Sequence, residues 1–225
     1  MLANAKSRKL LIYLFLYVCL FQIDFENLLS LTREQEIWLG LGKYALSAFV
    51  GCLLFFDELR KEMNSLLSYK KLFCLQILGY ILLYVFLNIL SGLVVTGLLE
   101  LLKSGNTNLQ NDIRIMETAK QVPPYIFLIF VGFIGPFVEE LVFRKSLLNL
   151  LRDRLSPKIA ILCQALLFAL VHVHLLSLIE FIQVIPHFII GIYWGYLYYK
   201  TQNIYYSMTV HMVTNTLALS LTFFT

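Results

Sequence analysis

Charged residues are scarce in this chain: Asp, Glu, Lys and Arg together make up 14% of its 225 residues. A soluble domain carries roughly 25% charged and about 45–50% apolar residues, whereas 59% of this chain is hydrophobic. This shortage of charge excludes an ordinary soluble domain. The net charge of +4 is dispersed over several short segments rather than gathered in one patch, so we expect no nucleic-acid partner.

Cysteine pairs, repeats and cleavage signals are also missing. The four cysteines, which are Cys19, Cys52, Cys74 and Cys163, form no C-x-x-C pair, so we interpret them as buried, unreactive thiols. No internal repeat or low-complexity tract is present. The basic start and the apolar stretch that follows it lead to no small-residue cleavage site, so we expect an uncleaved first span rather than a signal peptide.

What the sequence does contain is a series of long apolar segments. Such segments predict membrane spans, because about 20 helical residues cross a hydrocarbon core about 30 Å thick. They are longer than the roughly ten-residue strands of a membrane barrel and do not alternate in polarity. We therefore predict an all-α, polytopic transmembrane helix bundle with about seven spans and the lipid bilayer as its solvent. The segments are 10–29, 38–56, 72–102, 123–139, 159–179, 181–199 and 204–225.

The third segment is too long for one upright span, so it is tilted or extends beyond the lipid. The polar stretch 103–122 that follows is interpreted as a loop ending at Pro123 and Pro124. We accordingly divide the chain into an N-terminal transmembrane region, 1–122, with about three spans and the polar loop, and a core region, 123–225, with about four spans.

The basic residues orient the predicted spans. Lys and Arg accumulate in cytoplasmic loops. With the N-terminus inside, thirteen Lys and Arg residues fall in inside segments and four fall outside. The outside residues are Arg33, Lys103, Arg114 and Lys120. We therefore expect a multi-pass cell-membrane protein with a cytoplasmic N-terminus and an outer C-terminus.

Two adjacent carboxylates stand at the end of the fourth predicted span. Ionisable groups inside a membrane are costly and point to function by default. Glu140 and Arg144 are four residues apart on one helix face, where they can neutralise each other, while Glu139 has no basic residue four positions on. An unpaired carboxylate at the membrane edge suits acid–base chemistry. The alternative is an interfacial charge cluster that reaches into water.

Two further spans carry polar residues. Phe168 and His172 share one helix face, and His211 and Asn215 share another. His172 and His174 are about 200° apart, so only one of them can face a given site. Each set alone also fits helix–helix hydrogen bonding.

Taken together, these residues have complementary chemistry. Glu139 and His172 can bind and deprotonate a water molecule, while His211 and Asn215 can donate hydrogen bonds to the oxyanion of a tetrahedral intermediate. This is a set for amide hydrolysis without a Ser or Cys nucleophile. The predicted depths of Glu139 and His172 in the membrane differ. Glu139 lies at the inside end of its span, whereas His172 lies about 20 Å from the inside end of its own span. We therefore expect the fifth span to begin below the lipid surface, with Ser156 as the N-cap.

The motifs resemble those of the CPBP (Abi) family of CAAX-type proteases and bacteriocin-processing or immunity proteins. They are Glu139-Glu140-x-x-x-Arg144, Phe168-x-x-x-His172, Phe188-x-x-Gly191 and His211-x-x-x-Asn215, within residues 123–220. The resemblance implies that Glu139 and His172 activate water, that His211 and Asn215 stabilise the oxyanion, and that Glu140 and Arg144 support them. His174 and His187 fall outside these motifs and are interpreted as structural.

The resemblance implies a bacterial intramembrane endopeptidase. We expect it to be of glutamate type without a cofactor, since the sequence has no H-E-x-x-H motif. We expect it to cleave a peptide or membrane-tethered protein near the cytoplasmic face, in bacteriocin or peptide processing or self-immunity. Prenylated substrates are not expected in bacteria.

Three alternatives remain open at this point. A zinc metalloprotease would use Glu139, His172 and His211 as ligands. A non-catalytic membrane partner would act by contact with a bacteriocin system or a sensor kinase. A transporter also carries ionisable groups at mid-membrane, although the sequence has no inverted repeat to favour it.

Overall fold

The structure is a bundle of helices. The computed structural model describes residues 2–23, 30–104 and 109–221, and no strand occurs within these ranges. The N-terminal region forms α1 (Leu2–Phe21), α2 (Arg33–Leu67), α3 (Lys70–Leu101) and α4 (Gln110–Gln121). The rest forms α5 (Pro124–Phe127), η2 (Leu128–Ile134), α6 (Gly135–Glu139), η3 (Glu140–Leu148), α7 (Asn149–Arg152), α8 (Pro157–Leu170), α9 (Leu178–Gln183), α10 (Ile185–Thr201) and α11 (Ile204–Leu221). The all-α prediction is confirmed.

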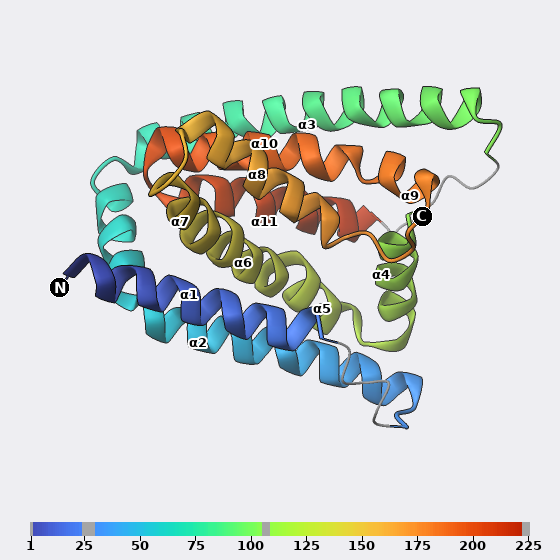
Figure 1. Cartoon of the computed structure of the whole chain (residues 1–225), viewed down its shortest axis with the longest axis horizontal. Coiled ribbons are helices and arrows are strands. Elements are labelled where there is room, and N and C mark those ends of the chain that lie inside the picture. The colour runs from blue at the N-terminus through green and yellow to red at the C-terminus, as the bar shows by residue number, and fades with distance from the viewer. Residues whose placement is uncertain (1, 24–29, 105–108, 222–225) are drawn as a thin grey trace.

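The long helices run side by side and turn back at two ends of the bundle (Figure 1). One end holds the N-terminus and the turns between α2 and α3, α7 and α8, and α10 and α11. The opposite end holds α4, α5 and α9. Because every long helix has one terminus at each end, the position of a residue along its helix gives its depth in the bundle.

Four of the helical stretches are long and apolar enough to cross a membrane: α2, α3, the continuous stretch Pro124–Arg152, and Leu178–Thr201. The helix α8 is apolar but shorter. Each of the seven predicted segments is helical over most of its described part. Their predicted ends at 24–29 and 222–225 lie outside the described residues, and the count of seven spans stays a prediction.

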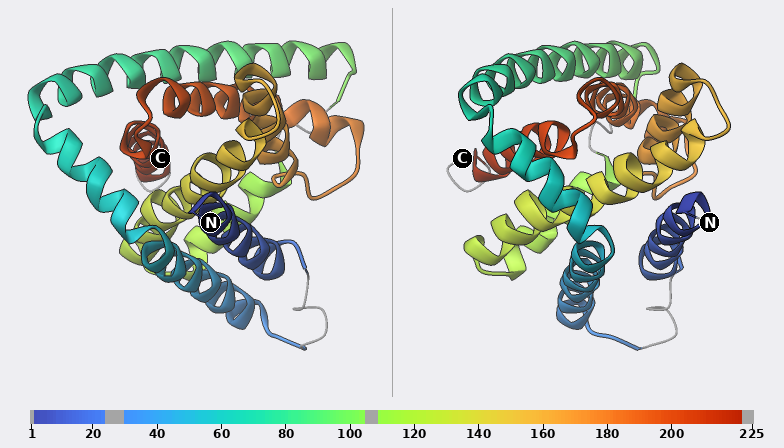
Figure 2. Two further views of the ribbon diagram at one scale, coloured as in Figure 1. Left: turned by 60° about the vertical axis from the view of Figure 1, so that its left-hand side comes forward. Right: turned by 90° about the vertical axis from the view of Figure 1, so that its left-hand side faces the viewer.

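The outer surface is apolar, as lipid contact requires. The helix α3 crosses the whole bundle on one side (Figure 2). Large apolar side chains such as Leu75, Leu82, Phe86 and Leu93 are more than half exposed on it. At 32 residues α3 is about 48 Å long, so it exceeds the hydrocarbon thickness, as its sequence predicted.

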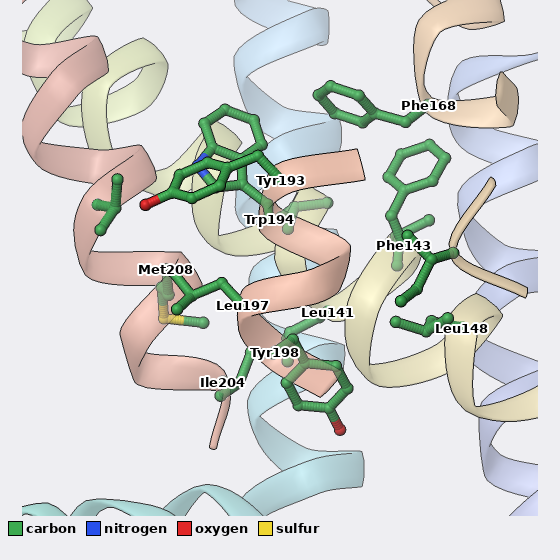
Figure 3. Close-up of a cluster of buried hydrophobic side chains, with 14 of the residues drawn as sticks. Leu141, Phe143, Leu148, Phe168, Tyr193, Trp194, Leu197, Tyr198, Ile204 and Met208 are labelled. Carbon is green, nitrogen blue, oxygen red and sulfur yellow. The ribbon is translucent and has the colours of Figure 1, made fainter. Parts of the chain in front are cut away.

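The interior is closely packed around α10. Its face toward α8 carries Gly191 and Gly195, and a Cβ atom at Gly195 would lie 2.6 Å from Nε2 of the buried Gln164. That amide instead donates a 2.8 Å hydrogen bond to the carbonyl of Gly191. Side chains of η3, α8, α10 and α11 complete the core (Figure 3). The glycines thus allow α8 and α10 to approach closely.

Several local predictions are wrong. The stretch 103–122 is not only a loop, since α4 occupies most of it. The fourth span does not end at Glu139, because its helix continues to Arg152. The fifth helix ends at Leu170, so His172 lies beyond its end.

The interpretation of the cysteines as buried is also wrong. Cys52 and Cys74 are exposed on the surfaces of α2 and α3, and Cys19 and Cys163 are partly exposed. The apolar runs that contain them face outward rather than into the core.

We expect Gly195→Ala to destabilise the bundle, because the new methyl group would displace Gln164 and break its bond to Gly191. Overpacking of this kind costs about 1–3 kcal/mol. Thermal unfolding in detergent measures the loss. The control is Gly92→Ala, where no atom lies within 4 Å of the new Cβ; equal melting temperatures for the two variants would contradict the packing argument.

Candidate active site

The helix that carries the two carboxylates is irregular where they lie. The stretch Pro124–Arg152 contains two π-helical segments, η2 before Glu139 and η3 from Glu140 onward. Within η3, Oγ of Ser146 donates to the carbonyl of Leu141, five residues back, at 2.8 Å. Such π-helical segments often occur at functional sites. Glu139 and Glu140 lie near the middle of this helix, about 20 Å from either end.

Glu140 is a fully buried carboxylate with three polar partners. Its Oε2 accepts a 2.6 Å hydrogen bond from Oγ of Ser207, and its Oε1 accepts a 3.0 Å bond from Nδ1 of His211. The guanidinium of Arg144, also fully buried, lies 3.5 Å from Oε1. The ion pair expected from the four-residue spacing is therefore present, and it is surrounded by protein rather than at the membrane edge.

Arg144 is held mainly by aromatic rings. The carbon at the centre of its guanidinium lies 4.6 Å from the ring centre of Phe168, 5.2 Å from that of Trp194 and 6.0 Å from that of Phe143. A desolvated cation over aromatic faces gains about 2 kcal/mol or more. Phe168 therefore supports the charge pair as well as preceding His172 in its motif.

His211 bridges the two carboxylates. Its Nδ1 faces Glu140 and its Nε2 lies 3.7 Å from Oε2 of Glu139. The indole of Trp194 stacks on its ring at 3.8 Å between centroids. Because a carboxylate can only accept, Nδ1 of His211 carries the hydrogen in this contact, and Nε2 is left facing Glu139.

His172 follows the end of α8 rather than lying within the helix. Its Nδ1 is 2.7 Å from the carbonyl oxygen of Phe168. A carbonyl also only accepts, so Nδ1 carries the hydrogen and Nε2 of the neutral ring is the proton acceptor. The ring of His187 packs against that of His172 at 4.2 Å between centroids. The side chain therefore caps the last turn of the helix and presents a basic nitrogen.

A single cavity of about 560 Å³ joins these groups. Glu139, His172, His211 and Asn215 all line it. The side chain of Glu139 is 17% exposed, in contrast to its fully buried neighbour. The four residues assigned to chemistry by the sequence thus come together from three separate helical stretches.

Glu180 organises the wall of the cavity beside His172. Its Oε2 accepts hydrogen bonds of 2.7 Å from the backbone N–H groups of His174 and Leu175, and its Oε1 accepts one of 3.2 Å from Gln110. The buried carboxylate therefore joins the loop after His172 to the first turn of α4.

Sequence reasoning missed several residues of this site. His187, interpreted as structural, lines the cavity against His172, and His174 lines it as well. Ser207 and Glu180 were not singled out. Ser207 lies four residues before His211 on the same helix face, which is the one sequence signal that could have found it.

The donor set for a metal is incomplete in the described part of the chain. Within residues 2–23, 30–104 and 109–221, no three His, Cys, Asp or Glu side chains are grouped as ligands of one ion. The ring of His211 is nevertheless oriented by a carboxylate, as zinc-bound histidines commonly are.

The segment that contains the site resembles known proteins. Residues 121–217 match the family described as type II CAAX prenyl endopeptidase Rce1-like. YdiL of Bacillus subtilis (strain 168), named as a membrane peptidase, is 26% identical over 107 residues, which are 48% of this chain and 41% of that protein. MroQ of Staphylococcus aureus (strain USA300), named as a membrane-embedded CAAX protease, is 30% identical over 129 residues, which are 55% of this chain and 49% of that protein.

Each of these alignments covers less than half of the relative's own length. No solved structure matches the chain. Both relatives are bacterial membrane proteins, in agreement with the multi-pass bundle described above.

We expect Arg144→Met to lower the free energy of unfolding by about 3–5 kcal/mol, because it leaves the buried charge of Glu140 without its cation. The double variant Arg144→Met with Glu140→Gln removes both charges and keeps a polar group beside His211 and Ser207. It should recover much of the lost stability in chemical or thermal unfolding. A double variant no more stable than the single one would contradict the pairing.

We expect Glu180→Ala to loosen the loop after His172. Each bond to a charged acceptor contributes about 1.5–3 kcal/mol, so the amides of His174 and Leu175 should exchange with deuterium about tenfold faster or more. Glu100→Ala, at an exposed carboxylate on α3, is the matched control. Unchanged exchange at 174–175 would show that Glu180 does not hold the loop.

Proposed function

We propose that this chain, whose residues 121–217 match the family described as type II CAAX prenyl endopeptidase Rce1-like, is an intramembrane endopeptidase of glutamate type. In this proposal a water molecule activated by Glu139 and His172 attacks the scissile carbonyl. The observation that carries it is that the two residues line one cavity with His211 and Asn215, and that the carboxylate of Glu139 is only partly buried.

Charge balance in the bundle supports these roles. Glu140 and Arg144 cancel each other, so a charged Glu139 would leave the buried cluster with one excess negative charge. Uncompensated charge is costly inside a membrane. One proton shared between Glu139 and Nε2 of His211, which lie 3.7 Å apart, makes the cluster neutral.

This shared proton links the activation of water by Glu139 to the stabilisation of the oxyanion by His211. When Glu139 is ionised and able to take a proton from water, the proton is on His211. Nε2 of His211 is then an N–H donor, as stabilisation of an oxyanion requires. The amide of Asn215, one helical turn further along α11, is assigned the second donor role.

We assign to His172 the role of orienting the attacking water molecule. Its hydrogen bond to the carbonyl of Phe168 leaves Nε2 as an acceptor. Together, Glu139 and His172 would accept the two hydrogens of one water molecule, so that an oxygen lone pair faces the substrate carbonyl. After attack, the proton held by Glu139 passes to the leaving amine.

We further propose that the reaction needs no metal. The sequence carries no H-E-x-x-H motif of the kind that many zinc proteases use. The alternative, zinc held by Glu139, His172 and His211, would use the carboxylate of Glu140 to orient one ligand. Peptide cleavage in the presence of a chelator separates the two: full activity supports the metal-free reaction, and activity lost to chelation and restored by zinc contradicts it.

The proposed biological context is bacteriocin or peptide processing, or self-immunity. Its support is the family match of residues 121–217 and two bacterial relatives, one of them named as a CAAX protease. The proposed substrate is a peptide or a membrane-tethered protein. The alternative is a non-catalytic partner that acts by contact.

The decisive variant is Glu139→Gln, which keeps the shape of the side chain and removes the base. We expect at least about a 100-fold loss of cleavage of a peptide library, read by mass spectrometry with the purified protein. Glu100→Gln, the same substitution at an exposed carboxylate outside the cavity, should cleave like the natural sequence. Full cleavage activity of Glu139→Gln would contradict the mechanism. If cells that carry Glu139→Gln keep full immunity, the alternative of a non-catalytic partner that acts by contact is favoured.

A further inference from the structure

The cavity leads from the candidate active site to one end of the bundle only. Glu139 and His211 line its inner part, while Arg114 and Thr118 of α4 and Arg33 at the start of α2 line its outer part. The helix α4 and the start of α2 lie at the end opposite the N-terminus (Figure 1). A substrate that follows the lining residues therefore reaches Glu139 from the α4 end.

The path from the other end is closed by packed side chains. These side chains come from the parts of η3, α10 and α11 nearer the N-terminal end, and Figure 3 shows them gathered in the core. They are Leu141, Leu148, Leu197, Ile204 and Met208, and each is at most 3% exposed. A second cavity, of about 480 Å³, does lie at that end. It shares no lining residue with the first among the described residues.

Ion pairs reinforce this closed end. Glu62 of α2 pairs with Lys145 of η3, and its other oxygen accepts a 2.7 Å hydrogen bond from the N–H of Ile204 at the start of α11. Lys9 of α1 pairs with Glu58 of α2. These contacts join the helices that carry Glu139 and His211 to each other through α2 at the N-terminal end. The cavity lies on the α4 side of them.

The two ends differ sharply in basic residues. At the end without a path, the described side chains include ten Lys and Arg residues: Arg8, Lys9, Arg60, Lys61, Lys70, Lys71, Arg152, Arg154, Lys158 and Lys200. At the α4 end there are four: Arg33, Lys103, Arg114 and Lys120. Short segments rich in Lys and Arg stay in the cytoplasm, so the α4 end is extracytoplasmic.

We infer that the cavity takes its substrate from the extracytoplasmic side of the membrane. This rests on the proposed function, and it replaces the expectation of cleavage near the cytoplasmic face. That expectation rested on the family resemblance and agreed with the placement of Glu139 at the inner end of its predicted span, whereas the residue lies in the middle of a longer helix.

The substrate class follows from this geometry. It is a peptide that has already been exported, or a membrane-tethered protein whose cleaved segment lies outside. The outer part of the cavity suits a polar chain, since it is lined by charged side chains of both signs, including Arg33, Glu36, Asp112 and Arg114. The inner part presents aromatic rings, among them Phe168 and Trp194, to an apolar residue near the cleaved bond.

Cysteine labelling tests the inference in whole cells. In a full-length chain whose four cysteines are replaced by Ser, single cysteines are introduced as Lys120→Cys on α4, Asn111→Cys in the cavity wall, and Lys158→Cys at the opposite end. A membrane-impermeant maleimide should label the first two equally before and after permeabilisation. It should label Lys158→Cys only afterwards. The reverse pattern would overturn the inference.

A second measurement covers the case in which the cysteine-free chain fails to accumulate. An epitope inserted after Ser104 should bind antibody on intact spheroplasts, and the same epitope inserted after Ser68 should not. Binding to the Ser68 insertion alone would contradict the inference. Neither experiment measures cleavage, so a failed orientation leaves the proposed protease chemistry standing, and a failed cleavage assay leaves the orientation standing.

Discussion

The buried carboxylate of Glu140 is the group on which the rest of the site depends. It joins Arg144 on its own helix to Ser207 and His211 on α11, and every one of these side chains is buried. A buried charge is stable only when it is paired and hydrogen-bonded. Burial of Glu140 therefore fixes α11 relative to the helix Pro124–Arg152 and fixes the ring of His211 in one orientation, with Nε2 toward Glu139.

The aromatic and glycine residues around this carboxylate also help to hold Arg144 and His211 in position. Phe168 and Trp194 cover the guanidinium of Arg144, and Trp194 also stacks on His211. They reach these positions because α8 and α10 approach closely at Gly191 and Gly195. The short motifs are thus parts of one packed unit: the F-x-x-x-H motif supplies a ring for Arg144, and the glycines allow α8 to approach α10.

The sequence was sufficient for the helical class, for the approximate position of each helix and for the pairing of Glu140 with Arg144, because these follow from long apolar runs and from four-residue spacing. It misplaced the depth of the site. On hydropathy alone, the charged residues Glu139 and Glu140 mark the end of an apolar span. The helix nevertheless continues past them, because a charge that is neutralised inside the bundle does not end a helix. This also explains the mismatch in depth between Glu139 and His172: the carboxylate lies deep, as the histidine does. The π-helical segments and the contact between His172 and His187 depend on packing between distant segments, which a single sequence does not reveal.

The central claim is that Glu140 holds His211 through Nδ1–H, so that Nε2 shares one proton with Glu139. Nitrogen NMR of the protein with ¹⁵N-labelled histidine, with His211→Gln to assign the signal, reports the protonation of each ring nitrogen directly. The account predicts that Nδ1 of His211 carries a hydrogen near neutral pH, whether or not Nε2 does. A ring protonated on Nε2 alone would contradict it, because Glu140 would then not be the partner that orients His211.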